Sequence, residues 1–496
     1  MNFKRVVRSI KKDGLRQTYS KHQEIKEKKK RISEITGFLE DGKIRVAAFV
    51  NDALKLPVTE VYDVLRAVID KYISYEDEIE SEPSLKEPAD QLLQAIRKAE
   101  QIPGYAKFMV KRYIKECLPA AYDSCRFQPI EKKAVFLQQR KGLNMSCRYM
   151  KKYIDKREIY STELHELRMG DYPLVYYYEK ACVFARSAAT AKVIFVHNQN
   201  DLLAYMKIRE ETKVVQLWHG CGLYKKVGMS IAGKPRRKTL EDYEEYPVSN
   251  NYSMVTVASP ALIWIYEEFM GIDADAGIIQ PIGVSRTDEF FNEGYMERSY
   301  RKLHKRIPEA REKKVILYAP TFRGEEPNRY APDRIDLEYL YNQLKDDFIL
   351  IIKHHQTLKS RPPIDPRYEG FAFDMTKGKG MNINELMTTA DMLITDYSSV
   401  AFEFSLFERP IIFFSYDLDE YEAERGLYDG YDDMTPGPIV RTNEELANTI
   451  RAMAREFDKT EIREFRRKYM SACDGHATER ILHYVETGEL TYPKSE

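Results

Sequence analysis

A short stretch at residues 216–226 combines chemically active side chains with residues that form tight turns. It contains Trp218, His219 and Gly220, followed by Lys225 and Lys226. A histidine at the end of a strand can act as a general base, glycine allows close backbone approach, and lysine can neutralise a phosphate. The alternative is a structural histidine in a tight turn. The combination of an apolar run, glycines and lysines favours the catalytic interpretation.

A second stretch ends an apolar run and opens a helical pattern with Thr395, Asp396, Ser398 and Ser399. Unpaired N–H groups at a helix start bind anions, so this turn predicts a site for a diphosphate. Plain helix capping is the alternative, but capping needs only one hydroxyl. Glu403 lies seven residues before Pro410, a spacing that also occurs in nucleotide-sugar transferases, whose Glu contacts the ribose.

Two more apolar runs end in polar side chains. Thr321 and Arg323 follow the first, and the Arg323 guanidinium is a rigid fork of donors suited to phosphate. Lys353, His354 and His355 follow the second. Neighbouring side chains on a strand point to opposite faces, so only one histidine can face a cleft, and we favour His355. These histidines cannot converge on one metal ion, and no Asp-x-Asp motif ends a strand, so we expect no obligatory metal.

The spacing of the apolar runs predicts the elements that position these residues. Four runs precede Arg286, at 134–137, 192–196, 214–217 and 254–257, and four follow it, at 315–318, 348–352, 392–394 and 411–414. Helical stretches separate them, which is typical of parallel sheets. We therefore predict two Rossmann-like domains facing across a cleft, at residues 129–286 and 287–496. Ligands of such sheets bind at the carboxyl ends of the strands.

Residues 1–128 are predicted to form a mostly helical N-terminal region. Apolar spacing indicates helices near residues 57–69, 88–99 and 105–118, with an acidic loop at 76–88. No catalytic pattern occurs here.

The beginning of this region is strongly basic. Residues 1–31 hold twelve Lys or Arg and three acidic residues, although the whole chain has a formal net charge of zero. Phe3, Val6, Val7 and Ile10 lie on one helical face, as in helices that lie on anionic membranes. A solvated tail or a helix packed on its own protein is an equally good interpretation.

Composition excludes several classes of protein. The chain of 496 residues is 43% hydrophobic and 31% charged, and its zero net charge gives no case for nucleic-acid binding. Its six cysteines form no Cys-x-x-Cys pair, so neither a zinc knuckle nor a disulfide-rich secreted domain is indicated. No apolar run is long enough for a membrane span, and no signal core follows the basic start. We expect a cytoplasmic protein that can be peripheral at the inner face of the cell membrane.

Taken in order, seven stretches resemble the CDP-glycerol glycerophosphotransferase family, which includes the primases and polymerases of teichoic acid synthesis. The resemblance implies a GT-B fold, no cofactor, and CDP-glycerol or CDP-ribitol as the donor substrate. The stretches are WHGCGLYKK (218–226), PIGVSRTD (281–288), YAPTFRG (318–324), IIKHHQ (351–356), NELMTTADMLITDYSSVAFEF (384–404), RGLYDGYDDMTPGPIV (425–440) and DGHATER (474–480).

The resemblance also implies roles for individual residues. His219 corresponds to the catalytic base and His355 to a second functional histidine. Donor contacts are implied for Arg323, Thr395, Asp396, Ser398, Ser399 and Glu403. Further candidate contacts with phosphate or acceptor are Gly220, Lys225, Lys226, Arg286, Thr321 and Lys353. This sequence departs from the usual family pattern with Gln356 after the histidine, Ser285 before Arg286, and Cys-Gly-Leu at 221–223 in place of Thr-Pro-Leu.

These expectations combine into one leading function and two alternatives. The leading function is transfer of a polyol phosphate, with glycerol phosphate favoured, to a lipid-linked or polymeric hydroxyl acceptor in the synthesis of teichoic acid or a related polymer, with release of CMP. One alternative is a GT-B glycosyltransferase that uses a nucleotide sugar. The other is a non-catalytic scaffold at the membrane.

Overall fold

A computed structural model describes residues 15–53, 55–139, 142–235, 237–324, 328–355, 358, 361–376, 380–428 and 430–493. The predicted membrane face at Phe3, Val6, Val7 and Ile10 lies outside these residues. The chain divides into a helical unit (residues 1–128, 139–141 and 166–189) and an α/β unit (residues 129–138, 142–165 and 190–496).

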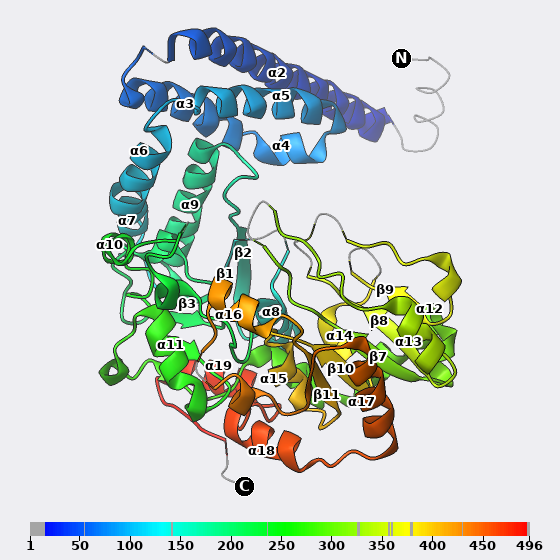
Figure 1. The fold of residues 1–496 in the computed structure, drawn as a ribbon. Coiled ribbons are helices and arrows are strands. Elements are labelled where there is room, and N and C mark those ends of the chain that lie inside the picture. Colours follow the sequence, from blue (N-terminus) through cyan, green and yellow to red (C-terminus); the bar gives the residue numbers. More distant parts are fainter. Residues whose placement is uncertain are drawn as a thin grey trace. The chain divides into compact units, whose positions relative to one another are not determined.

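The helical unit is built around a long helix, α2 (Leu15–Ala53), whose C-terminal half packs along α5 (Pro83–Ala99) (Figure 1). Ile35, Leu39 and Val46 are fully buried on one face of α2. The other helices are α3 (Val58–Ile73), α4 (Glu76–Ser81), α6 (Tyr105–Arg112), α7 (Leu118–Asp123) and α9 (Leu174–Ala188), with a π-helical turn, η1 (Tyr113–Cys117), between α6 and α7. The predicted helical region is thus confirmed.

The predicted loop at residues 76–88 is wrong. Residues 76–81 form α4, whose acidic first turn suits the positive end of a helix dipole. Pro83 then begins α5 at its first position, where a missing N–H costs nothing, and Pro88 lies inside that helix.

The α/β unit contains two six-stranded sheets. The first has the order β2 (Ser161–Glu166), β1 (Glu131–Gln138), β3 (Ala191–Val196), β4 (Lys213–Gln216), β5 (Met254–Thr256) and β6 (Ile279–Gln280). From β1 through β3, β4 and β5 to β6 the pairings are parallel. Helices α8 (Met145–Arg157), α10 (Leu240–Glu245) and α11 (Ile263–Met270) belong to the same part of the chain.

The second sheet has the order β12 (Ile439–Val440), β11 (Ile411–Phe414), β10 (Met392–Thr395), β7 (Lys314–Tyr318), β8 (Phe348–Ile352) and β9 (Ala372–Asp374), all parallel. The strand order reverses between β7 and β10, and this is where ligands of doubly wound sheets bind. Its helices are α12 (Glu293–Arg306), α13 (Leu337–Leu344), α14 (Ile383–Thr389), α15 (Val400–Ser405), α16 (Leu418–Arg425), α17 (Asn443–Arg455) and α18 (Thr460–Tyr469).

The chain finally returns to the first sheet through α19 (Ala477–Thr487). Ile481, Leu482 and Val485 join the buried cluster that contains Phe136 and Phe195. Asp288 fixes this return, because its carboxylate accepts the N–H groups of Ala477 at 3.1 Å and Thr478 at 2.8 Å at the start of α19. The predicted domain boundary at residue 286 places α19 in the second domain, although α19 packs on the first sheet.

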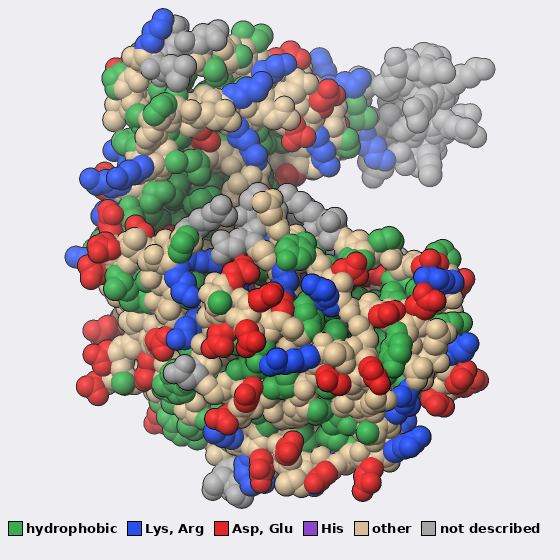
Figure 2. Space-filling model, viewed as in Figure 1, with side chains coloured by type: hydrophobic (Ala, Val, Ile, Leu, Met, Phe, Trp, Pro, Cys, Tyr) green, Lys and Arg blue, Asp and Glu red, His purple; other side chains and the backbone are tan. Residues whose placement is uncertain are grey.

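The predicted α/β architecture with two Rossmann-like sheets is confirmed. On the face of the α/β unit in Figure 2, Lys and Arg side chains are interspersed with Asp and Glu side chains, in keeping with the zero net charge. None of the described helices combines the length and apolar composition needed to cross a bilayer.

Candidate active site

The first predicted turn follows β4 and has an unusual backbone. Trp218 adopts a left-handed conformation with φ of 50°, which is rare for a bulky residue. Gln216 stabilises it, since its side-chain oxygen accepts the Trp218 N–H at 3.0 Å. The Trp218 ring packs on Phe269 with centroids 4.9 Å apart. The surroundings therefore impose the turn, as expected where a strained residue serves a site.

His219 carries an exposed imidazole at this turn. Its ring lies 4.2 Å from the Trp218 ring, and its Nδ1 lies 3.3 Å from the backbone oxygen of His197. A carbonyl oxygen can only accept, so Nδ1 carries the proton of the neutral ring and Nε2 carries the lone pair. His219 is thus held in the tautomer that a general base requires.

A buried ion pair holds the backbone on both sides of Gly220. Arg286 donates to the carbonyl oxygen of His219 at 2.7 Å, and Glu403 accepts the N–H of Cys221 at 3.2 Å. The two side chains lie 3.4 Å apart and are 7% and 1% exposed, respectively. These contacts give Glu403 and Arg286 a role in shaping the turn. Glu403 Oε2 and Arg286 Nε have no hydrogen-bond partner among the described residues, so their predicted substrate contacts stay predictions.

The two predicted turns lie against each other. A Cβ atom at Gly220 would lie 3.0 Å from the Ser399 hydroxyl oxygen, so a larger residue would force the Ser399 side chain to shift. Ser398 and Ser399 are half-buried at the start of α15. Their hydroxyls and backbone N–H groups remain candidates for contact with a donor phosphate.

Basic side chains surround the half-buried ring of Phe322, which follows β7. We call this group the cation ring: Lys225 Nζ lies 5.4 Å, Arg329 Cζ 4.5 Å and Arg425 Cζ 5.6 Å from the Phe322 centroid. The His355 ring is 5.2 Å away. These side chains bring positive charge to one aromatic ring, although Arg425 also pairs with Glu424 at 3.6 Å, and a bound diphosphate would neutralise further positive charge.

Lys225 is the member of the cation ring whose pKa is lowered. Burial lowers its pKa to about 8, the charge of Asp396 opposes this, and Arg425, Arg323 and Arg329 lower it further. In the described part of the chain, no carboxylate forms an ion pair with Lys225. A phosphate would supply the missing negative charge.

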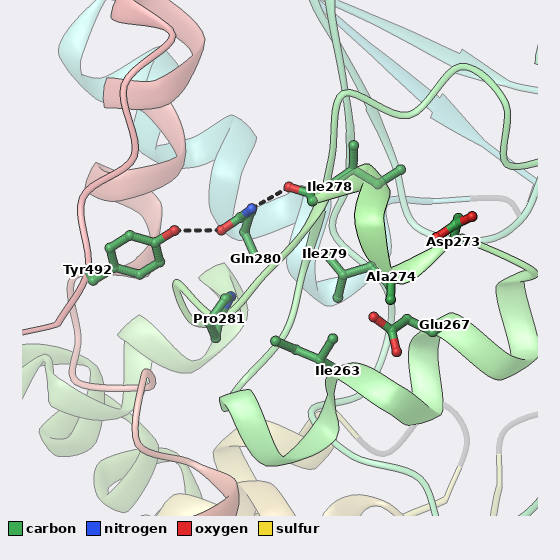
Figure 3. Close-up of a pocket in the computed structure, with 10 residues that line it drawn as sticks. Ile263, Glu267, Asp273, Ala274, Ile278, Ile279, Gln280, Pro281 and Tyr492 are labelled. Atoms are coloured by element: carbon green, nitrogen blue, oxygen red, sulfur yellow. Dashed lines mark hydrogen bonds between the residues drawn. The ribbon is translucent and has the colours of Figure 1, made fainter.

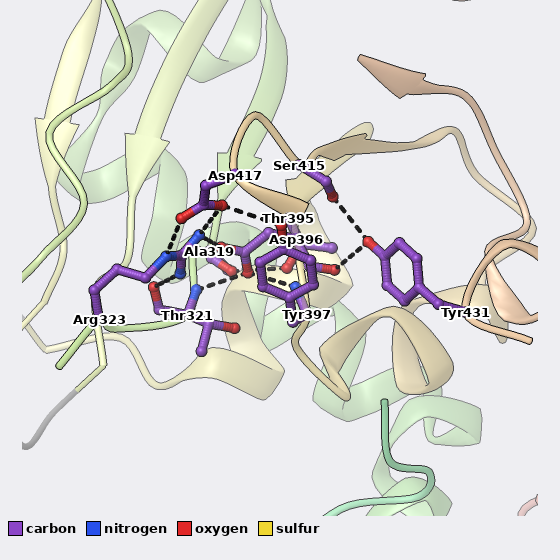
Figure 4. Close-up of polar contacts among 9 residues, drawn as sticks. All are labelled: Ala319, Thr321, Arg323, Thr395, Asp396, Tyr397, Ser415, Asp417 and Tyr431. Atoms are coloured by element: carbon purple, nitrogen blue, oxygen red, sulfur yellow. Dashed lines mark hydrogen bonds and ion pairs between the residues drawn. The ribbon is translucent and has the colours of Figure 1, made fainter. Parts of the chain in front are cut away.

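Arg323 requires a correction. It donates to Asp417 through Nε at 2.7 Å and Nη2 at 2.9 Å, to Asp396 at 3.0 Å and to the Thr321 carbonyl at 2.7 Å (Figure 4). It is 5% exposed. The predicted contact with a donor phosphate is therefore not supported, because these hydrogen bonds already use most of its donors.

Thr395 and Asp396 require the same correction. The Thr395 hydroxyl donates to the Ala319 carbonyl at 2.8 Å, and Asp396 Oδ1 accepts the N–H groups of Thr321 at 2.8 Å and Tyr397 at 2.7 Å (Figure 4). Both side chains are buried and join the ends of β7 and β10. They build the site, whereas the buried Thr321 hydroxyl has no hydrogen-bond partner among the described residues and stays a candidate ligand group.

Of the basic residues that follow β8 and the His219 turn, some are buried or already hydrogen-bonded and others lie beside aromatic rings. Lys353 donates to the carbonyls of Met375, Thr376 and Met381 at 2.6–3.0 Å, so its predicted phosphate contact is not supported. His354 is buried, which lowers its pKa, whereas His355 is half-buried beside Phe322. Lys226 lies over the Tyr428 ring at 5.9 Å, outside the cation ring.

A separate pocket of about 320 Å³ lies beside the edge strand β6 (Figure 3). Tyr492 closes one side by donating to the Gln280 side chain at 2.8 Å. None of its ten lining residues is basic, and Glu267 and Asp273 are acidic. This pocket is unsuited to a phosphate donor.

Sequence reasoning missed Phe322, Arg329, Arg425 and Asp417 as parts of the site. Phe322 and Arg425 lie within the stretches that resemble the family, but the sequence singled out neither as a site residue. Arg329 and Asp417 carry no local signal.

A family model described as CDP-Glycerol:Poly(glycerophosphate) glycerophosphotransferase matches residues 121–487. The chain is 35% identical over 310 residues to the teichoic acid poly(ribitol-phosphate) polymerase of Bacillus spizizenii, covering 62% of this chain and 48% of the relative. It is 34% identical over 304 residues to the teichoic acid glycerol-phosphate primase of Bacillus subtilis, covering 60% and 74%. The chain thus spans about half the length of the first of these relatives.

The solved structure of the wall teichoic acid polymerase TagF is similar in fold, with a TM-score of 0.62 and 22% identity over 78% of this chain and 95% of that one. This likeness confirms the predicted GT-B type of fold. The family match over residues 121–487, most of the chain, shows that the chain belongs to the CDP-glycerol:poly(glycerophosphate) glycerophosphotransferase family.

Proposed function

We propose that this protein transfers a polyol phosphate, with glycerol phosphate as the first candidate, from its CDP-linked donor to a hydroxyl acceptor. The acceptor is a lipid-linked or polymeric precursor of teichoic acid or a related cell-surface polymer. The observation that carries the proposal is the cation ring around Phe322, a site for a diphosphate at the carboxyl ends of β7 and β8. The named activities of relatives from Bacillus support the choice of reaction.

The chemistry follows from the tautomer of His219. Its Nε2 removes the proton from the acceptor hydroxyl as that oxygen attacks the β-phosphorus of the donor. The bond from the β-phosphorus to the bridging oxygen breaks, and CMP leaves with that oxygen and the bonding electrons. The product is a phosphodiester between acceptor and polyol. Positioning and charge stabilisation are the main requirements of such a step.

Each sheet has its own task in this proposal. The first domain, residues 129–286, presents His219 to the acceptor hydroxyl. The second domain, residues 287–496, holds the CDP-donor through His355, the Ser398 and Ser399 turn and the Thr321 hydroxyl. Lys225 comes from the first domain but contributes to the donor side through Phe322.

The basic start of the chain is proposed to hold the protein at the inner face of the cell membrane. In the described part of α2, Lys26, Lys29 and Lys30 are exposed in the N-terminal half of the helix. Lys28 and Arg31 pair with Glu82 and Glu78. Sedimentation with phosphatidylglycerol vesicles, but not with phosphatidylcholine vesicles, is expected, and replacing these three lysines by alanine should weaken it. Equal binding to both vesicles would contradict the proposal.

Donor profiling tests the reaction itself. The protein is incubated with CDP-glycerol, CDP-ribitol or a UDP-sugar, together with a short glycerol phosphate oligomer or a lipid-linked disaccharide, and the products are identified by mass. Release of CMP with an acceptor heavier by one polyol phosphate is expected. Release of a nucleoside diphosphate would identify a glycosyltransferase, and absence of turnover with every pair would favour a scaffold.

A further inference from the structure

Tyr224 of the first domain is enclosed by aromatic rings of the second. Its ring centroid lies 5.0 Å from Phe402, 5.4 Å from Tyr431 and 6.1 Å from Phe413. Its hydroxyl donates to the Met434 carbonyl at 2.9 Å, and the residue is 1% exposed. The side chain is therefore fixed in position by both apolar contact and a hydrogen bond.

The backbone around Tyr224 is paired with the same domain. Lys225 forms an antiparallel bridge with Leu427. Lys226 N–H donates to the Gly426 carbonyl at 2.9 Å, and Tyr428 N–H donates to the Tyr224 carbonyl at 2.8 Å. In such a pairing successive side chains point to opposite sides, which places Lys225 on Phe322 and Lys226 on Tyr428.

Gly222 shows how closely this segment is fitted. A Cβ atom there would lie 2.4–2.5 Å from the Phe402 ring, so no other residue is accommodated without movement of that ring. The bulky Phe402 and the small Gly222 thus form a matched pair that brings Tyr224 into its enclosure.

We propose that Tyr224 is a positioning residue for the donor site: its ring, enclosed by Phe402, Phe413 and Tyr431, fixes the segment that delivers Lys225 to the cation ring. The assignment of the ligand as the donor diphosphate rests on the proposed function. The placement of Lys225 by Tyr224 does not, because it concerns the free protein. No other residue of the first domain joins the group around Phe322 among the described residues.

Two variants of the full-length protein separate the ring of Tyr224 from its hydroxyl. Tyr224→Phe keeps the aromatic contacts and should preserve the KM for CDP-glycerol within about threefold, since a single neutral hydrogen bond is lost. Tyr224→Ala should raise that KM about tenfold or more, because Lys225 no longer reaches the phosphates. Phe371→Ala, which removes a buried ring from the core of the second sheet, is the matched control for lost stability.

Selective methylation of Lys225, followed by mass spectrometry across pH, reports its surroundings without any turnover. In the native protein and in Tyr224→Phe, labelling should rise with a midpoint near the pKa of about 8. In Tyr224→Ala and not in Phe371→Ala, the midpoint should move toward about 10.4, the ordinary lysine value. An unchanged profile in Tyr224→Ala would overturn the proposal. If Tyr224→Ala shifts the midpoint as expected but the native protein shows no turnover with any CDP-polyol, the proposed reaction fails while the role of Tyr224 stands.

Discussion

Replacing Glu403 by glutamine removes the negative charge of the ion pair that holds the His219 turn and leaves the shape of the side chain almost unchanged. The amide oxygen can still accept the Cys221 N–H, now made at 3.2 Å. Arg286, which is 7% exposed and lies 3.4 Å from the carboxylate, would keep a buried charge without its counter-ion. Removing one partner of a buried pair costs about 3–5 kcal/mol, and we expect the lower end because the hydrogen bond to Cys221 survives.

Two measurements on Glu403→Gln separate the structural role from substrate contact. Urea unfolding should show a loss of about 3 kcal/mol. Steady-state release of CMP should show kcat reduced about 10–100-fold with little change in the KM for CDP-glycerol, because the turn that carries His219 is displaced while the cation ring remains. A ribose contact, as the sequence suggests, would instead raise KM and leave stability unchanged. That second pattern would show that Glu403 contacts the substrate and does not hold the turn.

Glu408→Gln is the matched control. Glu408 pairs with Arg463 at 2.9 Å and Arg466 at 2.8 Å, but all three side chains are partly exposed, so a loss of less than about 1 kcal/mol is expected. The double variant Arg286→Met with Glu403→Leu removes both buried charges. The double variant should lose less free energy of unfolding than the two single variants lose together, because neither charge is left unpaired.

Three further predictions follow from the site and its supports. Because the pKa of Lys225 is lowered to about 8 and a bound phosphate would raise it, the KM for CDP-glycerol should increase as pH rises through 8, with Lys225→Arg flattening this dependence and a flat native profile contradicting it. Burial raises the pKa of Asp288 to about 6, above an unfolded value of about 4, so the folded state binds more protons in this range. The free energy of unfolding should therefore fall as pH rises from about 4 to about 6, and Asp288→Asn should remove that slope in urea unfolding. Gly222→Ala should cost about 1–3 kcal/mol by overpacking against Phe402, and Phe402→Leu should recover part of the loss in the double variant; additive losses would show that the two do not interact.

Local sequence was sufficient for the longer elements of the fold. The apolar runs at 348–352 and 411–414 coincide with β8 and β11. The two-residue strands β6 and β12 were beyond prediction, since a period-two pattern cannot be recognised in so few residues. They form only because neighbouring strands offer pairing partners.

For the site, the sequence located the strand ends but could not show which polar groups were already paired. Arg323 and Lys225 look equally suited to phosphate in the sequence. Arg323 is bound by Asp417, 94 residues away, whereas Lys225 has no ion-pair partner in the described chain. Glu403 meets Cys221 across 182 residues. Such pairings join residues that are far apart in the sequence, within one domain for Arg323 and between the two for Glu403, and hydrophobic periodicity does not predict them.

In the proposed reaction, His219 takes the proton of the acceptor hydroxyl during transfer of a polyol phosphate. The direct test compares CMP release from CDP-glycerol by the native protein and by His219→Ala, with a glycerol phosphate oligomer as acceptor and equal folded fractions verified by circular dichroism. Loss of a general base predicts a decrease of about 100-fold or more in kcat, with binding of CDP-glycerol retained. Undiminished CMP release by His219→Ala would show that His219 is not the general base.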